Sequence, residues 1–194
     1  RDVGLTHEPG GTPEAEDVRG LPVSGDVTRW TAGAEALLNY AARDSHLEKI
    51  VRPALARGAL VICDRFMDST RAYQGYAGGC GMDLLDALEH SIVGATRPDL
   101  TLIFDLDPAQ GLARAKSRAG NEDRYERKGL EFHAKLRDGF LDILRRDPVL
   151  MLLTEDDVLS LALYPLELEK APAAFGALRW GPRCALDVVR RVLE

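Results

Sequence analysis

The sequence predicts an α/β protein whose parallel sheet is wrapped by helices. Three short apolar runs, at residues 59–63, 100–104 and 149–153, show no polar alternation. Such runs are typical of strands that are buried on both faces, as in parallel sheets. Segments of helical composition separate the runs, so right-handed crossovers would connect the strands.

The first predicted elements are a short strand and a helix. Residues 2–7 alternate weakly between polar and apolar side chains and predict the strand. The turn EPGGT at residues 8–12 follows, and its threonine is a good N-cap just before Pro13, which suits the first helical position. We therefore expect a helix over residues 13–19 and a loop over residues 20–30, which proline and glycine punctuate.

Further helices are predicted from the spacing of apolar residues. The Ala- and Leu-rich residues 31–57 predict a long helix that is broken near Ser45 and ends at Pro53 or Gly58. The charged residues 119–128 are expected to be mobile. Later helices are expected at residues 69–76, 83–93, 108–118 and 130–145.

Length, charge and cysteine content bound the class of protein. A chain of 194 residues fits one domain with a sizeable core, and its formal net charge of −6 argues against nucleic-acid binding through overall charge. The apolar runs are far shorter than the roughly 20 residues of a membrane-spanning helix. Three cysteines without a CxxC pair favour a reducing cytoplasm, and the spacing of the four histidines indicates no zinc site.

Polar residues are expected at the carboxyl ends of the strands, where open parallel sheets bind ligands. The glycines of the turn at residues 8–12 would let a ligand approach the backbone, with a helix N-terminus behind it. Asp64 and Arg65 follow the second strand, and an acid beside a fork-shaped cation suits metal–phosphate chemistry. The alternative interpretations are a plain strand-to-helix turn and a structural Asp–Arg pair.

Two further groups of residues add to this edge. Tyr73 and Gln74 offer an aromatic face and an amide that could read the edge of a base. The basic residues in the segment 114–128 could neutralise charge on a phosphoryl group during its transfer. A solvated charged face is the alternative interpretation of that segment.

Together these motifs resemble bacterial thymidylate kinases. The resemblance covers residues 3–148, in order and with the family's spacing. It implies a three-layer α/β fold like that of P-loop nucleoside-monophosphate kinases, a kinase-like domain over residues 1–148 with a lid at about 114–128, and a cytoplasmic homodimer. The matching sequences are EPGGT at 8–12, YAAR at 40–43, DRFxxSTxAYQG at 64–75, RPDLT at 97–101, DL at 105–106 and DRYE at 123–126.

The resemblance implies a reaction and an acceptor site. The γ-phosphoryl group of ATP would move, with Mg²⁺, onto thymidine monophosphate (dTMP). Arg65 would hold the acceptor phosphate, while Arg43 and Gln74 would contact the thymine edge. Ser69, Thr70 and Tyr73 would form the pocket for the base and the sugar. Glu8 would lie on the loop that faces the acceptor.

The same resemblance implies which residues act on the transferred group. Asp64 would lie near the magnesium ion and the phosphates. Arg118 and Arg124 would be the lid cations nearest the transferred phosphoryl group. With Arg65 these are the expected catalytic residues, because phosphoryl transfer depends on positioning and positive charge more than on a covalent partner.

Departures from the family pattern change what is expected. No Gly-x-x-x-x-Gly-Lys-Ser/Thr sequence occurs in the 194 residues, so the resemblance predicts a fold without its first strand and phosphate loop, and a poor kinase. A kinase-like protein that binds a nucleotide or a partner without catalysis is the alternative. Asn39 replaces the phenylalanine that usually stacks on thymine, which leaves another nucleoside monophosphate open as the acceptor. Residues 149–194 are expected to form an atypical segment that closes the domain.

Overall fold

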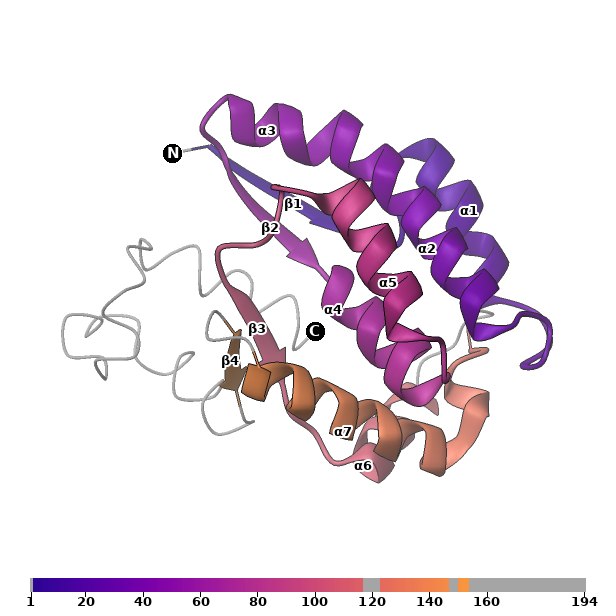
Figure 1. Ribbon diagram of the computed structural model, residues 1–194. Helices are drawn as coiled ribbons and strands as arrows, with labels where there is room; N and C mark the ends of the chain where they lie inside the picture. Colours follow the sequence, from indigo (N-terminus) through magenta and orange to yellow (C-terminus); the bar gives the residue numbers. More distant parts are fainter. Residues whose placement is uncertain (1, 117–122, 147–149, 154–194) are drawn as a thin grey trace, which may run out of the picture.

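The strands are parallel, as the sequence predicts. The computed structural model describes residues 2–116, 123–146 and 150–153 (Figure 1). In these residues β1 pairs with β2 and β3 pairs with β4, each in parallel. The predicted parallel α/β class is confirmed, and each predicted strand forms. The strands are β1 (Val3–His7), β2 (Leu60–Asp64), β3 (Thr101–Phe104) and β4 (Leu150–Leu153).

The strands are less buried than predicted, and this corrects the sequence analysis. The residues of β2 are half-buried or exposed, and in β3 only Ile103 is buried. Within the described residues the strands form two separate pairs, so each strand has a partner on one side alone. The register of the first pair sets His7 opposite Asp64, and the Glu8 amide donates to the Asp64 carbonyl at 2.9 Å. This register brings two of the predicted site motifs together.

Helix α1 (Pro13–Val23) begins as predicted and ends four residues later than predicted. The Thr12 hydroxyl accepts the amide of Ala15, so Thr12 is the N-cap, and the helix starts at a proline. At the other end, the carbonyl of Leu21 accepts from Trp30 and that of Pro22 accepts from Arg124. These distant donors satisfy carbonyls that a helix end leaves unpaired, and local sequence does not reveal them.

The long helix predicted after Thr31 forms without the break expected near Ser45. It runs as α2 (Ala32–His46), a π-helical stretch η1 (Leu47–Val51) and α3 (Arg52–Ala56). The wider turn suits a proline at position 53, because a proline ring in an α-helix clashes with the carbonyl four residues earlier. The helix ends before Gly58, which has a φ of 75° and is one of the two predicted stops.

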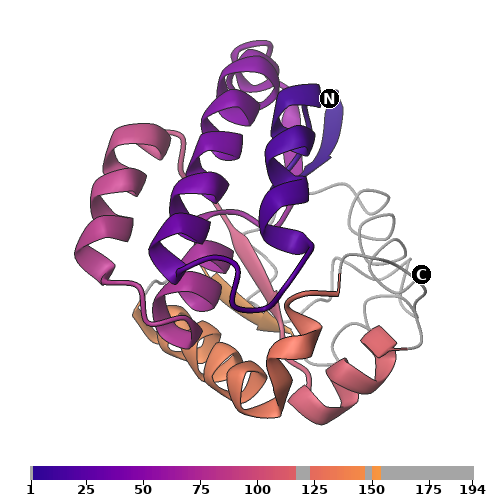
Figure 2. The ribbon, with the colours of Figure 1, turned by 90° about the vertical axis from the view of Figure 1, so that its right-hand side faces the viewer.

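The remaining helices surround the strands (Figures 1 and 2). Figure 2 shows α1, α2 and α5 side by side, with α6 and α7 below them. All the predicted helices form, two of them with π-helical second halves. Their bounds are α4 (Met67–Thr70), η2 (Arg71–Ala77), α5 (Met82–Leu88), η3 (Glu89–Val93), α6 (Pro108–Lys116), η4 (Glu126–Lys128) and α7 (Gly129–Arg146).

Two apolar clusters hold these helices together. The larger one joins α2, α5 and η3 around Tyr40, Leu47 and Leu85, all of which are buried. The smaller one joins η2 and α7 through Ala72 and Leu136. Part of the predicted lid, residues 117–122, lies outside the described residues. Most of the predicted C-terminal segment also lies outside them, because residues 147–149 and 154–194 are not described.

Candidate functional site

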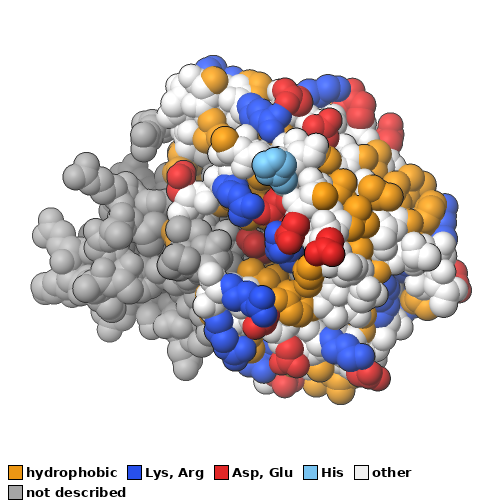
Figure 3. Space-filling view, in the orientation of Figure 1, with side chains coloured by type: hydrophobic (Ala, Val, Ile, Leu, Met, Phe, Trp, Pro, Cys, Tyr) orange, Lys and Arg blue, Asp and Glu red, His pale blue; other side chains and the backbone are white. Residues whose placement is uncertain are grey.

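The predicted acceptor residues converge on one cavity. It has a volume of about 160 Å³ and lies at the carboxyl ends of β1 and β2, beside α2 and η2. In Figure 3, basic and acidic side chains mingle near the centre of the face shown. All the residues predicted to bind the acceptor line this cavity: Glu8, Arg43, Arg65, Ser69, Thr70, Tyr73 and Gln74.

A buried carboxylate anchors the first wall of the cavity. Glu8 is 3% exposed and accepts hydrogen bonds from Arg43 Nε at 2.7 Å and from His46 Nδ1 at 2.9 Å. The other ring nitrogen of His46 lies 2.6 Å from the Thr6 hydroxyl. Sequence reasoning missed His46. Its spacing of three residues from Arg43, which puts both on one helix face, is the signal that could have found it.

Arg43 is held on several sides but keeps one donor unpaired. Its Nη2 donates to the Thr70 hydroxyl at 3.1 Å, and its guanidinium lies over the rings of Tyr40 and Phe66 at 4.4 and 5.2 Å. Its Nη1 is buried and has no hydrogen-bond partner among the described residues. Buried donors are nearly always paired in folded proteins, so this nitrogen is an exception, and it belongs to a residue that lines the cavity.

Arg65 also lines this cavity. Its backbone has a φ of 64°, a left-handed conformation that costs a non-glycine residue about 1–3 kcal/mol. Such backbone strain is concentrated at functional sites, where it aims a side chain. The Arg65 side chain donates to the Tyr73 hydroxyl at 3.3 Å, and its guanidinium lies 5.3 Å from the centre of the Tyr73 ring.

The Gln74 amide is bound by the protein at both ends. Its Nε2 donates to Glu35 at 2.9 Å and to the Tyr125 hydroxyl at 3.0 Å, and its Oε1 accepts from Asn39 at 3.2 Å. Asn39 and Tyr125 also line the cavity. The predicted contact of Gln74 with a base remains a prediction, now with the orientation of the amide defined by these partners.

Asp64 does not line this cavity, although its backbone carbonyl is bound to the Glu8 amide. Its side chain is exposed at the end of β2. In the part of the chain that the structure describes, no group of three His, Cys, Asp or Glu side chains lies close enough together to hold a metal ion by itself. A lone carboxylate still fits Mg²⁺, which is commonly held by one or two carboxylates together with substrate phosphates.

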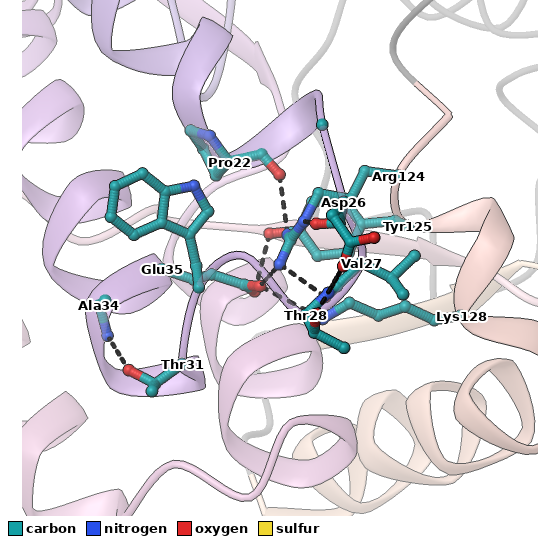
Figure 4. A network of polar contacts seen from close by, with 12 residues as sticks. Pro22, Asp26, Val27, Thr28, Thr31, Ala34, Glu35, Arg124, Tyr125 and Lys128 are labelled. Carbon is teal, nitrogen blue, oxygen red and sulfur yellow. Dashed lines mark hydrogen bonds and ion pairs between the residues drawn. The ribbon is translucent and has the colours of Figure 1, made fainter.

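The two predicted lid cations have different outcomes. Arg118 lies outside the described residues. Arg124 is fully buried and is absent from the residues that line the cavity. It donates to the carbonyls of Pro22, Asp26 and Val27 at 2.8–3.0 Å and pairs with Glu35 at 2.7 Å (Figure 4). Arg124 is therefore not part of a solvated charged face, whereas Asp123 and Arg127 beside it are exposed, and the catalytic role of Arg124 stays a prediction.

Asp105, which follows β3, lines a second cavity of about 330 Å³. Arg65 and Tyr73 also line this cavity. Both carboxylate oxygens of Asp105 accept from Arg137, at 2.6 and 2.7 Å. These hydrogen bonds lower the pKa of Asp105 below its ordinary value. Asp105 is thus ionised and paired, and it joins β3 to α7.

A parallel α/β fold with cationic side chains around a cavity at the strand ends defines a phosphotransferase of the nucleoside-monophosphate-kinase class. A crystal structure of thymidylate kinase from Ehrlichia chaffeensis matches the fold with a TM-score of 0.64 and 33% identity, covering 84% of this chain and 79% of that one. The family model for thymidylate kinase matches residues 1–161, and the chain belongs to that family.

Curated relatives agree with this assignment. The chain is 54% identical to thymidylate kinase of Caulobacter vibrioides over 147 residues, which cover 76% of this chain and 70% of that protein. It is 53% identical to thymidylate kinase of Ruegeria pomeroyi over 144 residues, covering 74% and 68% of the two chains. Within the described residues, none of the helices combines the length and apolar character that crossing a membrane requires.

Proposed function

We propose that the cavity binds dTMP and that the protein phosphorylates it with the γ-phosphoryl group of ATP. The observation that carries this proposal is the buried, unpaired Nη1 of Arg43 in the wall of a cavity that also holds Arg65. A carbonyl oxygen of a base would pair the first cation, and a phosphate would pair the second. Membership of the thymidylate kinase family supports this acceptor over other phosphorylated metabolites.

The chain's own residues contribute by binding and orientation. Arg65 offers a fork of donors that matches two oxygens of the acceptor phosphate, and its contact with Tyr73 limits its freedom. Glu8 and Thr70 hold Arg43 in one orientation, so little entropy is lost when a base binds. An acceptor fixed in this way presents its phosphate for in-line attack, which is the main requirement of phosphoryl transfer.

The donor side is assigned less completely. Mg²⁺, when bound, would neutralise charge on the donor phosphates, and we propose Asp64 as the carboxylate nearest to it and Arg118 as a lid cation. The 194 residues contain no phosphate-loop sequence, so we assign no residue of this chain to the cradle of the ATP phosphates. The homodimer and the cytoplasmic location that the resemblance implies remain predictions.

Calorimetric titrations with dTMP and with ATP, followed by a phosphoryl-transfer assay with both, test the proposal. We expect saturable dTMP binding that the variant Arg43→Met reduces by about a hundredfold, because a buried ligand oxygen then loses its charged partner. dTMP binding with no turnover at any ATP concentration would favour a nucleotide-binding protein without catalysis. Absence of dTMP binding to the wild-type protein would contradict the proposal.

A further inference from the structure

A second buried carboxylate lies just behind the cavity wall. Glu35, in the first turn of α2, is fully buried and accepts from two different parts of the chain, at Gln74 and at residues 124–128. One oxygen is bound by Arg124 at 2.7 Å and by Lys128 at 3.3 Å. The other is bound by Gln74 at 2.9 Å and by the Tyr125 hydroxyl at 3.0 Å. Glu35 was not among the site residues predicted from the sequence.

The charge balance shows that Glu35 is ionised. Burial raises the pKa of Glu35, but the hydrogen bonds from Gln74, Arg124 and Tyr125 and the charge of Lys128 together hold this pKa below its ordinary value. Two cations, Arg124 and Lys128, face the one carboxylate. An ionised carboxylate can only accept hydrogen bonds, so every group that points at it must donate.

Because Glu35 only accepts hydrogen bonds, it fixes the orientation of the Gln74 side-chain amide. The NH₂ group must face Glu35, so the carbonyl oxygen must face the other way, toward Asn39. The cavity wall thus combines an acceptor on Gln74 with donors on Asn39 and on Arg43, whose Nη1 is unpaired. A thymine edge carries an N–H donor at N3 between two carbonyl acceptors, whereas cytosine carries an acceptor at N3.

The same carboxylate ties residues 123–128 to the wall. Tyr125 and Glu126 line the cavity, and the Tyr125 hydroxyl donates to Glu35 while it accepts from Gln74. Arg124 extends the connection through three backbone carbonyls, one at Pro22 near the end of α1 and two at Asp26 and Val27 in the segment between α1 and α2. Glu35 itself does not line the cavity, so it can act on a ligand only through these neighbours.

We propose that Glu35 is a positioning residue that sets base selectivity, because it orients the Gln74 amide so that the cavity presents an acceptor to the N3–H of thymine. This inference rests on the proposed dTMP site. Glu35 holds the acceptor of Gln74 in place and fixes the Tyr125 wall beside it. Without the carboxylate, the amide can rotate and offer its NH₂ group, which suits the N3 acceptor of cytosine.

The test compares the affinities of wild type and Glu35→Gln for dTMP and for deoxycytidine monophosphate (dCMP). Glutamine has the same shape as glutamate but can donate as well as accept, so it no longer dictates the orientation of Gln74. We expect dTMP to bind about tenfold more weakly and the preference for dTMP over dCMP to fall by about tenfold. A preference that stays within twofold of wild type would overturn the proposal.

Glu89→Gln is the matched control. Glu89 is equally buried and is bound by two arginines, Arg71 and Arg97, but neither it nor they line the cavity. Its replacement removes a buried charge of the same kind without touching Gln74. We expect the nucleotide preference of this variant to stay within twofold of wild type, and a fall as large as that of Glu35→Gln would overturn the proposal.

A second variant covers the case in which Glu35→Gln folds poorly. Glu35→Gln leaves Arg124 and Lys128 facing no carboxylate, and the added change Lys128→Met removes one of these two charges. The double variant should fold more readily and should lose the preference for dTMP to the same extent. A double variant that regains the wild-type preference would show that charge imbalance, rather than amide orientation, caused the loss.

Amide hydrogen exchange without nucleotide separates this inference from the proposed function. The amides of residues 123–128 should exchange about tenfold faster in Glu35→Gln than in wild type or Glu89→Gln, because the carboxylate no longer anchors them. Equal exchange in the three proteins would overturn the positioning role. A wild-type protein that bound neither nucleotide would instead contradict the proposed dTMP site and the selectivity that depends on it, whatever the exchange rates.

Discussion

Two buried carboxylate–arginine pairs, each with one member on α2, look alike in composition and differ in what they leave unpaired. In the Glu8–Arg43 pair, the Arg43 Nη1 has no partner among the described residues. In the Glu35–Arg124 pair, each guanidinium nitrogen of Arg124 has a carbonyl or carboxylate partner. We propose that a ligand completes the first pair, whereas the second is already complete within the protein. The function of a buried arginine therefore depends on its donors rather than on the motif that contains it.

The largest expected effect comes from removing the cation of the complete pair. Arg124→Met leaves Glu35 buried with only Lys128 as a cation and frees three carbonyls, so we expect a loss of about 3–5 kcal/mol in the free energy of unfolding. Urea denaturation measures it. Arg127→Met is the control, because Arg127 is exposed and its ion pair with Asp123 is worth about 1 kcal/mol or less. Similar losses in both variants would show that Arg124 is no anchor.

We expect a substitution of His46, which binds Glu8, to destabilise the network around the Glu8–Arg43 pair. His46→Leu removes a fully buried ring that bridges Glu8 and Thr6, and the unpaired groups should cost about 1–3 kcal/mol of stability. His7→Leu is the matched control, since the ring of His7 contacts Glu16 on the surface. Thermal unfolding of the two variants measures the difference. A His46 variant as stable as wild type would remove His46 from this network.

A smaller effect is expected from the hydroxyl that joins the complete pair to the cavity. Tyr125→Phe keeps the ring, which packs against Tyr73 and Phe132, and removes two hydrogen bonds, one donated to Glu35 and one accepted from Gln74. We expect a loss of about 0.5–1.5 kcal/mol in the free energy of unfolding, measured by urea denaturation. A loss as large as that of Arg124→Met would mean that the hydroxyl, rather than the guanidinium, is the main anchor.

The smallest expected effect is a dependence on pH. The folded-state pKa of Glu35 lies below its ordinary value of 4.5, so the folded protein binds this proton less readily than the unfolded chain does. The stability that Glu35 contributes is therefore present above pH 4.5 and is lost as the pH falls through the folded-state pKa. Urea midpoints measured from pH 7 down to pH 3 should fall less steeply in Glu35→Gln than in wild type. Parallel curves would contradict an ionised Glu35.

Local chemistry was enough to predict the order and type of the elements. Thr12 caps α1, Gly58 ends the long helix, and the apolar runs form parallel strands. The end of α1 was predicted too early because the donor to the Pro22 carbonyl is Arg124, 102 residues away in the sequence. The strands were predicted to be fully buried because an apolar run does not reveal how many neighbours a strand has.

The site could be predicted where it rests on short motifs and not where it rests on distant partners. The motifs placed Arg43, Arg65 and Gln74 at one cavity. His46 and Glu35 were missed because their partners lie 38 and 90 residues away, at Glu8 and Tyr125. The pairing of Glu35 with Tyr125 can be read only from the folded chain, whereas the helical spacing of His46 from Arg43 was a local signal that could have been followed.

The most direct test of the central claim is a calorimetric titration of dTMP into wild type and Arg43→Lys. Lysine keeps the charge beside Glu8 but lacks the planar fork that carries the unpaired Nη1. The account predicts a variant that still unfolds cooperatively, with some loss of stability from the lost contact with Thr70, and that binds dTMP about tenfold or more weakly than wild type. Equal dTMP affinity in the two proteins would contradict the claim that the unpaired nitrogen of Arg43 is completed by the ligand.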